Sequence, residues 1–521
     1  MRTVLFSLAL TAAIGGCGRD SGKRREPPAP PPVTPTAVGQ PVAVAGSAAG
    51  SAAPGSAAGS AGPGSAAGSA TPPAELPPLA ADKGGNLGAP LWSTSVGGEQ
   101  VDLGRAIAVA PDGTIYVGGD FEAKATFGAA GERTSAGKSD AVLIRIGADG
   151  TIGGAWPLGG PNQERGDAVA VDADGNVAFA GLFSDKVALG EITASANGSD
   201  DAFVAGFDSK GTAQWLWSAG GRGSDDASAI AAAPGGGWIV AVSFAEVITL
   251  GGVQLTSRGN DDIALVKLTR DGDVAWVTQL GGEGYDLINR IAVDAQGGIY
   301  TLGAFRDTTD LGGGPLKSGG ALDVVVARFD ATGKHRWSKR LGNPFNEKPG
   351  GLAVDPAGGI VITGSFDKDV DFLGTPVLSK GESDVFVARL TGDGALAWVK
   401  TFGAEREDAG FGVAVDAAGT AVVTGWFEGT VDFGGGPLKG KGYHDAFVAR
   451  FGRDGAFRGA VRFGDQDYDE GRAIALAPDG ATVATGVFRY TNDLGPGKPV
   501  ARQAPGTRFA KPDAFIVKLA P

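Results

Sequence analysis

The chain has 521 residues, of which 90 are glycine and 30 are proline, and a formal net charge of −13 at neutral pH. A single compact core rarely grows to this length, so several domains or an array of repeats is expected. The acidic balance excludes nucleic acid as a partner, because nucleic-acid-binding surfaces are basic. Cys17 is the only cysteine, so no disulfide can form within the chain.

The N-terminus reads as an export signal. Arg2 precedes an apolar run over residues 4–14, which is too short to span a bilayer as a mature helix. The run ends in Ile14-Gly15-Gly16-Cys17, which resembles a bacterial lipobox. By that resemblance, residues 1–16 are a lipoprotein signal peptide and Cys17 becomes the lipidated N-terminus. The alternative is an ordinary signal peptide with an incidental cysteine. Because Gly18 follows rather than Asp, we expect an outer-membrane lipoprotein, facing the periplasm or the cell surface.

Residues 17–87 are predicted to be a flexible tether between the lipid and a folded domain. Residues 27–35 are rich in proline and residues 45–70 consist of Ala, Gly and Ser with scattered Pro. Such a segment buries too little apolar surface to offset the entropy of ordering. The lipid on Cys17 is then the only attachment to the membrane.

Residues 88–521 contain one phrase seven times, and fixed-period self-similarity indicates a repeat architecture. The phrase begins at Asp140, Asp201, Asp262, Asp323, Asp384, Asp445 and Asp513, with five steps of 61 residues and a last step of 68. Glycines in a turn recur at Gly113, Gly175, Gly236, Gly297, Gly358, Gly419 and Gly480. Phenylalanines recur at Phe121, Phe183, Phe244, Phe305, Phe366, Phe427 and Phe488. Each unit therefore carries the same short strands and turns.

One unit shows the order of its elements. Residues 410–416 and 420–427 alternate like strands around a glycine turn, a long connection follows, and residues 445–451 begin a second hairpin. Four-stranded units of this kind bury their faces against neighbours, and radial closure leaves only short edges. We predict an all-β fold: a seven-bladed β-propeller of four-stranded antiparallel blades.

The two ends of the repeat region predict how the ring closes. Residues 91–98 match an outermost fourth strand such as residues 275–282, and residues 513–519 match a third strand. The last unit lacks a fourth strand, so we expect the N-terminal strand to complete it.

The phrases around residues 431–435 (VDFGG) and 445–450 (DAFVAR) resemble the bacterial β-propeller repeats called SBBP repeats. The resemblance covers about residues 88–521. It implies a propeller that is exported or lies at the cell surface, but no particular function, since propellers host many unrelated roles.

In a propeller of this order, the links between blades and the long links between second and third strands share one face, here called the loop-rich face. A carboxylate recurs in each inter-blade link: Asp102, Glu164, Asp225, Asp286, Glu347, Asp408 and Asp469. Such a ring is a candidate site for a cation or a basic ligand, and Ca²⁺ is the ion that it would suit. The alternative is a local bond in which each carboxylate caps the turn before its own strand.

Other recurring residues are expected to be structural. These are the aspartates that open the third strands and the tryptophans Trp92, Trp156, Trp217, Trp276, Trp337 and Trp398. Function is expected instead in residues that break the repeat on the loop-rich face: Trp426, Tyr285, Tyr468, Phe345, Arg165, Arg222, Arg406 and His444.

Nothing in the sequence identifies an enzyme. The chain has no nucleophile elbow or zinc motif, and its two histidines, His335 and His444, have no recognisable partners. We therefore expect a non-enzymatic, monomeric binding or scaffold propeller without a cofactor, which engages an envelope protein or polysaccharide through its loop-rich face. The alternative is a surface polysaccharide hydrolase or lyase that uses paired carboxylates in a central pocket.

Overall fold

The computed structural model describes residues 42–43, 87–98, 100–490, 494 and 511–521. The predicted signal peptide, Cys17, most of the tether and most of the long connection over residues 492–512 lie outside the described residues. The chain divides into residues 1–38 and residues 39–521, and the second unit contains everything described below. Of the described residues, none forms a helix with the length and apolarity needed to cross a bilayer.

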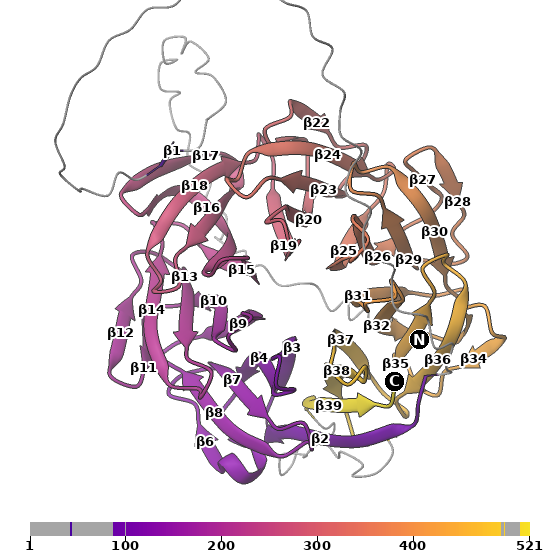
Figure 1. Ribbon diagram of the computed structural model, residues 1–521, viewed down its shortest axis with the longest axis horizontal. Coiled ribbons are helices and arrows are strands. Elements are labelled where there is room, and N and C mark those ends of the chain that lie inside the picture. Colours follow the sequence, from indigo (N-terminus) through magenta and orange to yellow (C-terminus); the bar gives the residue numbers. More distant parts are fainter. Residues whose placement is uncertain (1–41, 44–86, 99, 491–493, 495–510) are drawn as a thin grey trace, which may run out of the picture. The chain divides into compact units, whose positions relative to one another are not determined.

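Seven four-stranded antiparallel blades form a ring in the second unit (Figure 1), as the repeats predict. Blade 1 consists of β3 (Asp102–Val109), β4 (Ile115–Phe121), β7 (Asp140–Ile146) and β8 (Ile152–Leu158). Blade 2 consists of β9 (Glu164–Val171), β10 (Val177–Phe183), β13 (Asp201–Phe207) and β14 (Ala213–Ala219). Blade 3 consists of β15 (Asp226–Ala232), β16 (Trp238–Leu250), β17 (Val253–Leu268) and β18 (Val274–Leu280).

Blade 4 consists of β19 (Asp286–Val293), β20 (Ile299–Phe305), β23 (Asp323–Phe329) and β24 (His335–Leu341). Blade 5 consists of β25 (Glu347–Val354), β26 (Ile360–Phe366), β29 (Asp384–Leu390) and β30 (Leu396–Phe402). Blade 6 consists of β31 (Asp408–Val415), β32 (Ala421–Phe427), β35 (Asp445–Phe451) and β36 (Phe457–Phe463). Blade 7 consists of β37 (Glu470–Leu476), β38 (Thr482–Phe488), β39 (Asp513–Leu519) and β2 (Pro90–Gly98).

The ring closes as the sequence predicts. The N-terminal strand β2 pairs antiparallel with the last strand β39, with Thr94 opposite Ile516 and Val96 opposite Ala514. Ile516 is fully buried. Residues from the two ends of the propeller thus share one sheet, and backbone hydrogen bonds rather than a covalent link hold blade 7 together.

The hydrophobic core is divided among the junctions between blades. One cluster joins Leu143 of blade 1 to Phe179 and Phe203 of blade 2. The second and third strands are almost wholly buried because blades cover both of their faces, whereas most residues of the outermost strands are half-buried or exposed. Burial of this kind, at about 25 cal/mol per Å² of apolar surface, makes each blade depend on its neighbours.

Tryptophans on the outermost strands connect neighbouring blades, as expected. The indole N–H of Trp337 donates to the carbonyl of Gly392 at 2.9 Å, and that of Trp398 donates to the carbonyl of Arg453 at 2.9 Å. In blade 2 the residue that makes this bond is Trp215, to the carbonyl of Arg270 at 2.9 Å, because Trp215 holds the third position of its strand. Trp217 packs against the core cluster that blades 2 and 3 share.

The loop-rich face carries the inter-blade links and a second set of short strands. The long connections form small hairpins: β5 (Lys124–Thr126) with β6 (Glu132–Thr134), β11 (Lys186–Leu189) with β12 (Ile192–Ser195), β21 (Thr308–Asp310) with β22 (Pro315–Lys317), β27 (Val370–Phe372) with β28 (Thr375–Val377), and β33 (Thr430–Asp432) with β34 (Pro437–Lys439). A 3₁₀ turn, η1 (Gly128–Ala130), lies between β5 and β6. The remaining short strand, β1 (Val42–Ala43), pairs with β18.

Candidate functional site

Each innermost strand contains a bulge at the same position. The partner strand skips one residue there, which the sequence repeat did not reveal; the bulged residues are Arg105, Asp167, Ser228, Asn289, Gly350, Phe411 and Arg472. Bulges redirect a side chain and are frequent beside functional sites. The innermost strands surround the centre of the ring (Figure 1). We call these strands the wall of the central channel, and their bulged residues differ chemically from blade to blade.

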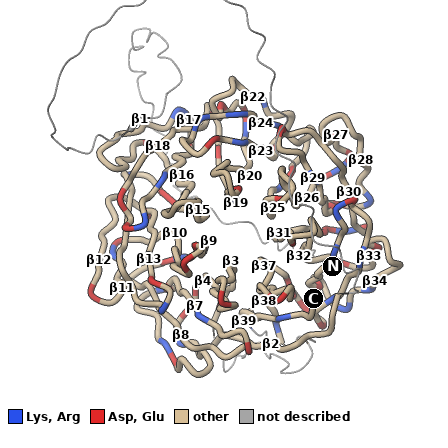
Figure 2. The backbone as a smooth tube through the Cα atoms, in the orientation of Figure 1, with Lys and Arg blue, Asp and Glu red and all other residues tan. Residues whose placement is uncertain are grey.

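Charged residues of blades 1 to 3 form a connected network at this wall. Arg105 pairs with Asp120 at 2.5 Å within blade 1. Arg165 donates to Asp167 at 2.8 Å and to Asp226 of the next blade at 2.8 Å. Acidic and basic residues along the innermost strands are visible around the centre in Figure 2. Arg165, one of the predicted repeat-breaking residues, is therefore a link between blades 2 and 3.

Two carboxyl groups of this network share one guanidinium. Burial raises the pKa of Asp226 to about 7, and the adjacent charge of Asp167 and a hydrogen bond with it act in the same direction, while Arg165 opposes them. Asp226 therefore exchanges a proton with solvent near neutral pH, which makes the net charge of the channel wall dependent on pH.

A second cluster lies between blades 6 and 7 and contains three of the predicted residues. The ring of Trp426 stacks on that of His444 with centroids 3.6 Å apart, and His444 meets Tyr468 edge to face at 4.6 Å. Tyr443, which is 57% exposed, stacks on Tyr468 at 5.4 Å. We call Trp426, Tyr443, His444 and Tyr468 the aromatic surface.

Polar contacts hold the aromatic surface in place. His444 Nδ1 lies 3.1 Å from Glu470, which also pairs with Arg472 at 2.6 Å. Although burial opposes it, the charges of Arg472 and His444 lower the pKa of Glu470 to about 2. Arg489 lies over the Tyr468 ring, 5.1 Å from its centroid. These contacts fix the orientation of aromatic rings that are otherwise free to turn, at a position next to the loop-rich face.

The seven predicted ring carboxylates are all buried at the blade junctions. Each accepts a hydrogen bond from the backbone N–H four residues earlier, at 2.7 to 3.1 Å. This is the local capping bond of the alternative interpretation. Among the residues with described positions, no three His, Cys, Asp or Glu side chains gather as a metal site. The geometry therefore favours a structural role for the column.

Burial gives these carboxyl groups unusual acidities. It raises the pKa to about 6 for Asp286, about 7 for Asp225 and Asp408, and about 8 for Asp102, Glu164, Glu347 and Asp469. In each blade junction the aspartate that opens the preceding third strand adds to the effect. The folded protein thus favours protonated carboxyl groups at these positions.

Glu347 and Asp323 show the arrangement of one such pair. A Cβ atom on residue 342 would lie 2.6 Å from Asp323 Oδ1 and 2.7 Å from Glu347 Oε2, so only glycine fits between the two carboxyl groups. Asp323 accepts from Arg340 at 2.7 Å and from the Gly319 N–H at 2.8 Å. Asp323 Oδ1 and Glu347 Oε1 are buried, and neither has a hydrogen-bond partner in the described part of the chain.

The remaining predicted residues do not join either cluster. Phe345 is 49% exposed on the link between blades 4 and 5, and Arg222 is exposed on the link between blades 2 and 3. Arg406 pairs with Glu428 at 2.8 Å. Tyr285 lies beside Asp261, and burial together with the charge of Asp261 raises the pKa of the Tyr285 hydroxyl. His335 packs against Phe329 on an outer strand.

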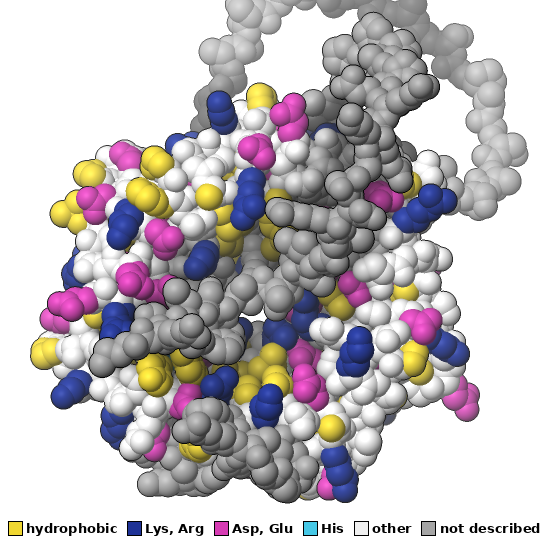
Figure 3. Space-filling view, turned by 180° about the vertical axis from the view of Figure 1, so that it is seen from behind, with side chains coloured by type: hydrophobic (Ala, Val, Ile, Leu, Met, Phe, Trp, Pro, Cys, Tyr) yellow, Lys and Arg dark blue, Asp and Glu magenta, His cyan; other side chains and the backbone are white. Residues whose placement is uncertain are grey.

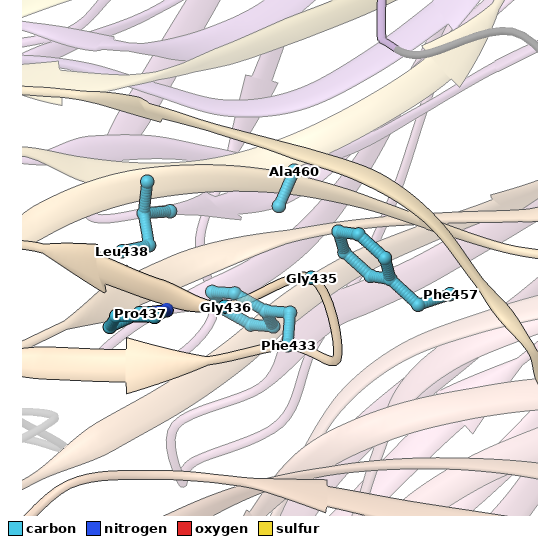
Figure 4. A pocket seen from close by; sticks show the side chains of 7 residues that line it. All are labelled: Phe433, Gly435, Gly436, Pro437, Leu438, Phe457 and Ala460. Atoms are coloured by element: carbon cyan, nitrogen blue, oxygen red, sulfur yellow. The ribbon is translucent and has the colours of Figure 1, made fainter.

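A hollow of about 230 Å³ lies at the β33–β34 hairpin of blade 6 (Figure 4), and this hairpin lies at the outer edge of the ring in Figure 1. Phe433, Leu438 and Phe457 line it together with glycines of the β33–β34 turn. It holds no charged side chain, and both aromatic rings belong to or pack against the blade core. Seen from behind, the ring has an opening at its centre with acidic, basic and hydrophobic side chains at its edge (Figure 3).

These features define the chain as a seven-bladed β-propeller built from a repeated four-stranded unit. Residues 275–303, from the outer strand of blade 3 to the second strand of blade 4, match the family model of the SBBP beta-propeller repeat. The resemblance noted in the sequence is thereby confirmed for the repeat.

The relatives found by comparison assign no activity. The regulatory protein FlaEY of Caulobacter vibrioides is 26% identical over 176 residues, which make up 32% of this chain and 18% of that protein. The Pan2 WD40 domain of Neurospora crassa is similar at a TM-score of 0.40 and 12% identity, with 80% of this chain and 89% of that chain covered. A gluconolactonase of Xanthomonas campestris is similar at a TM-score of 0.34 and 12% identity, and the match covers 82% of this chain and 98% of that chain.

Proposed function

We propose that this protein is a non-enzymatic binding propeller of the bacterial envelope. In this proposal it is anchored to the outer membrane by a lipid on Cys17, acts as a monomer, and holds an envelope protein or polysaccharide on its loop-rich face. No cofactor takes part. The propeller fold supports the coarser part of the proposal, because a rigid ring that displays variable loops is a suitable binding scaffold.

The aromatic surface is the observation that supports binding. Trp426, Tyr443, His444 and Tyr468 come from the second strand of blade 6 and from links of blades 6 and 7, at positions that break the repeat. Rigid aromatic side chains beside charged ones are typical of binding hot spots, because they bury area at small entropic cost. The exposed and stacked Tyr443 is accessible to a partner.

The test is binding of the purified full-length protein to peptidoglycan, lipopolysaccharide, capsular polysaccharide and individual purified envelope proteins. Replacing Tyr443 and Tyr468 by serine is expected to weaken the binding by at least about 10-fold. Phe345→Ser is the matched control, because Phe345 is an exposed aromatic residue of an equivalent link in another blade. A partner that is retained by the tyrosine variant would overturn the assignment of the aromatic surface.

The anchor and a metal are tested separately. Cys17→Ser should move the protein from the membrane fraction to the soluble envelope fraction, and mass spectrometry should find no acylated N-terminus. Treatment with EDTA is expected to leave the melting temperature unchanged. A drop of several degrees that added Ca²⁺ reverses would instead favour a calcium-stabilised scaffold.

The alternative function is a surface polysaccharide hydrolase or lyase, and one observation favours it. Asp167 and Asp226 form a carboxyl pair at the channel wall, and Asp226 retains a proton near neutral pH. However, both carboxyl groups bind one guanidinium and each other, whereas glycosidases hold their carboxyl groups about 5 Å or more apart to admit substrate. Release of reducing ends from envelope polysaccharides by the protein, but not by its Asp226→Asn variant, would establish this alternative.

A further inference from the structure

One arginine departs from the pattern of the innermost strands. The residue that follows each bulge is small in six blades, namely Ala106, Ala168, Ala229, Gly351, Gly412 and Ala473, and in blade 4 it is Arg290. Small residues are needed there because the strands converge: a Cβ atom at Gly351 would lie 2.6 Å from the backbone nitrogen of Val413 in the next blade. A large side chain at this level is compatible with the ring only when it extends toward the channel.

Arg290 has no carboxylate partner among the described residues, unlike the other channel arginines. Its one hydrogen bond to a described residue joins Nη1 to the carbonyl of Asn289 at 2.8 Å. Arg105, Arg165 and Arg472 each pair with a carboxylate at 2.5 to 2.8 Å. A guanidinium has five N–H donors, so most of those of Arg290 are available to a ligand, and its side chain is only partly buried.

The neighbouring charges leave this guanidinium attractive to one negative charge. Burial lowers the pKa of Arg290, and only Asp167 acts on it in the opposite direction. Asp167 itself is already bound by Arg165. A monoanion would therefore gain a charge-assisted, bidentate contact with Arg290. A phosphate dianion would bring two negative charges to one unpaired cation that already lies within reach of the charge of Asp167, which is a poorer match.

The bulged residue beside Arg290 supplies a second polar group. Asn289 Oδ1 is buried and has no hydrogen-bond partner in the described part of the structure. Buried polar atoms are rarely left unpaired, and an unpaired one costs about 1 to 3 kcal/mol. The oxygen accepts a hydrogen bond, so the group that satisfies it is a donor such as a sugar hydroxyl. A carboxylate with a hydroxyl beside it is the arrangement found in a uronic acid.

We propose that the channel wall at blade 4 binds the carboxylate and an adjacent hydroxyl of a uronic acid, with Arg290 contacting the carboxylate and Asn289 the hydroxyl. This site is separate from the aromatic surface and goes beyond the proposed function. The net charge of −13 repels a polyanion, and at physiological ionic strength this repulsion acts mainly within about 8 Å of the protein. A polysaccharide chain laid across the surface would meet the repulsion along its whole length. The favoured ligand is therefore one terminal acidic sugar that enters the channel.

The test measures binding of glucuronic acid to the full-length protein by ligand-observed NMR titration. Arg290→Ala is expected to weaken it at least about 10-fold and to fold normally, because four other blades carry alanine at this position. Arg222→Ala removes an exposed arginine elsewhere on the loop-rich face and is expected to change nothing. Glucose and glucose 6-phosphate should bind at least about 10-fold more weakly than glucuronic acid.

Three results would overturn the proposal. They are no binding of glucuronic acid to the unmodified protein, equal binding by the Arg290→Ala variant, and equal binding of N-acetylglutamate, which would indicate an acidic peptide instead. The variant with Tyr443 and Tyr468 replaced is expected to bind glucuronic acid normally. Loss of binding at Arg290 and Asn289 is therefore distinguishable from loss of binding at the aromatic surface.

Discussion

Replacing Glu347 by glutamine is expected to stabilise the protein at high pH and to have little effect at low pH. Glu347 Oε1 is buried without a hydrogen-bond partner among the described residues, and Glu347 Oε2 lies near the carboxyl group of Asp323. Burial, with the charge of Asp323, raises its pKa from 4.5 to about 8. A glutamine oxygen still accepts the hydrogen bond from the Asn343 N–H, and the glutamine side chain carries no charge at any pH.

The size and sign of the effect follow from linkage. A carboxyl group whose pKa is higher in the folded state stabilises the fold fully below the unfolded pKa, and this stabilisation is lost as pH rises through the folded pKa. For Glu347 the window runs from 4.5 to about 8. At about 1.4 kcal/mol per pKa unit, the loss at pH 8 is at most about 5 kcal/mol. Allowing for relaxation around the group, we expect the variant to gain about 2 to 4 kcal/mol at pH 8.5 and about zero at pH 4.

Melting temperatures between pH 4 and 8.5 measure this effect. In one cooperative unit of roughly 430 residues, 1 kcal/mol changes the melting temperature by about 1 °C, so a gain of about 2 to 4 °C is expected at pH 8.5. Asp149→Asn is the control with the opposite sign, because the Thr151 N–H lowers the pKa of Asp149 on the exposed surface. Its small destabilisation should disappear as pH falls. A Glu347→Gln variant that is less stable than the parent at pH 8.5 would refute the reasoning.

Three further outcomes are expected. Ile516→Ala, in the strand that closes the ring, should cost about 2 to 5 kcal/mol in chemical denaturation because Ile516 is fully buried; an equal loss from the exposed Leu378→Ala would show that the assay does not report ring closure. Gly220→Ala should destabilise by about 1 to 3 kcal/mol because a methyl group there overlaps the carboxyl group of Asp201, whereas Gly153→Ala meets only a distant arginine nitrogen and should be neutral. Asp226→Asn should abolish the pH dependence of glucuronic acid binding between pH 6 and 8, since the pKa of Asp226 is about 7; in the parent, affinity should rise as Asp226 is protonated and its negative charge is lost, and a parent without this dependence would contradict the expectation.

The fold was predictable from the sequence because every feature that builds a blade occurs seven times. A glycine such as Gly419 in a tight turn and a phenylalanine such as Phe427 at the end of a strand mark the same structural position in each unit. Closure was predictable as well, because residues 91–98 match an outermost strand that the last unit lacks. The family match over residues 275–303 agrees with these repeats.

The candidate site was predictable only in part, because its contacts join different blades. Trp426, His444 and Tyr468 were recognised as repeat-breaking residues, but only the folded chain brings them together. Tyr443 and Glu470, which complete the cluster, also lie at variable positions of the repeat, but the sequence does not distinguish them from other variable residues.

The channel residues escaped prediction for another reason. A bulge inserts one residue that the partner strand skips, and this changes which side chains face the channel. Its position depends on the pairing of two strands, which the repeat of the sequence does not show. One signal was present and was missed: Arg290 replaces alanine or glycine in a column of the repeat.

The pairing of β2 with β39 has a consequence for the order of events during folding. Blade 7 needs strands from both ends of the repeat region, so the ring stays open until its last segment has been synthesised. Until then the two unpaired sheet edges are exposed to proteases and chaperones. A ribosome that stops early therefore releases an open array, and the closing strand serves as a checkpoint that marks a complete chain.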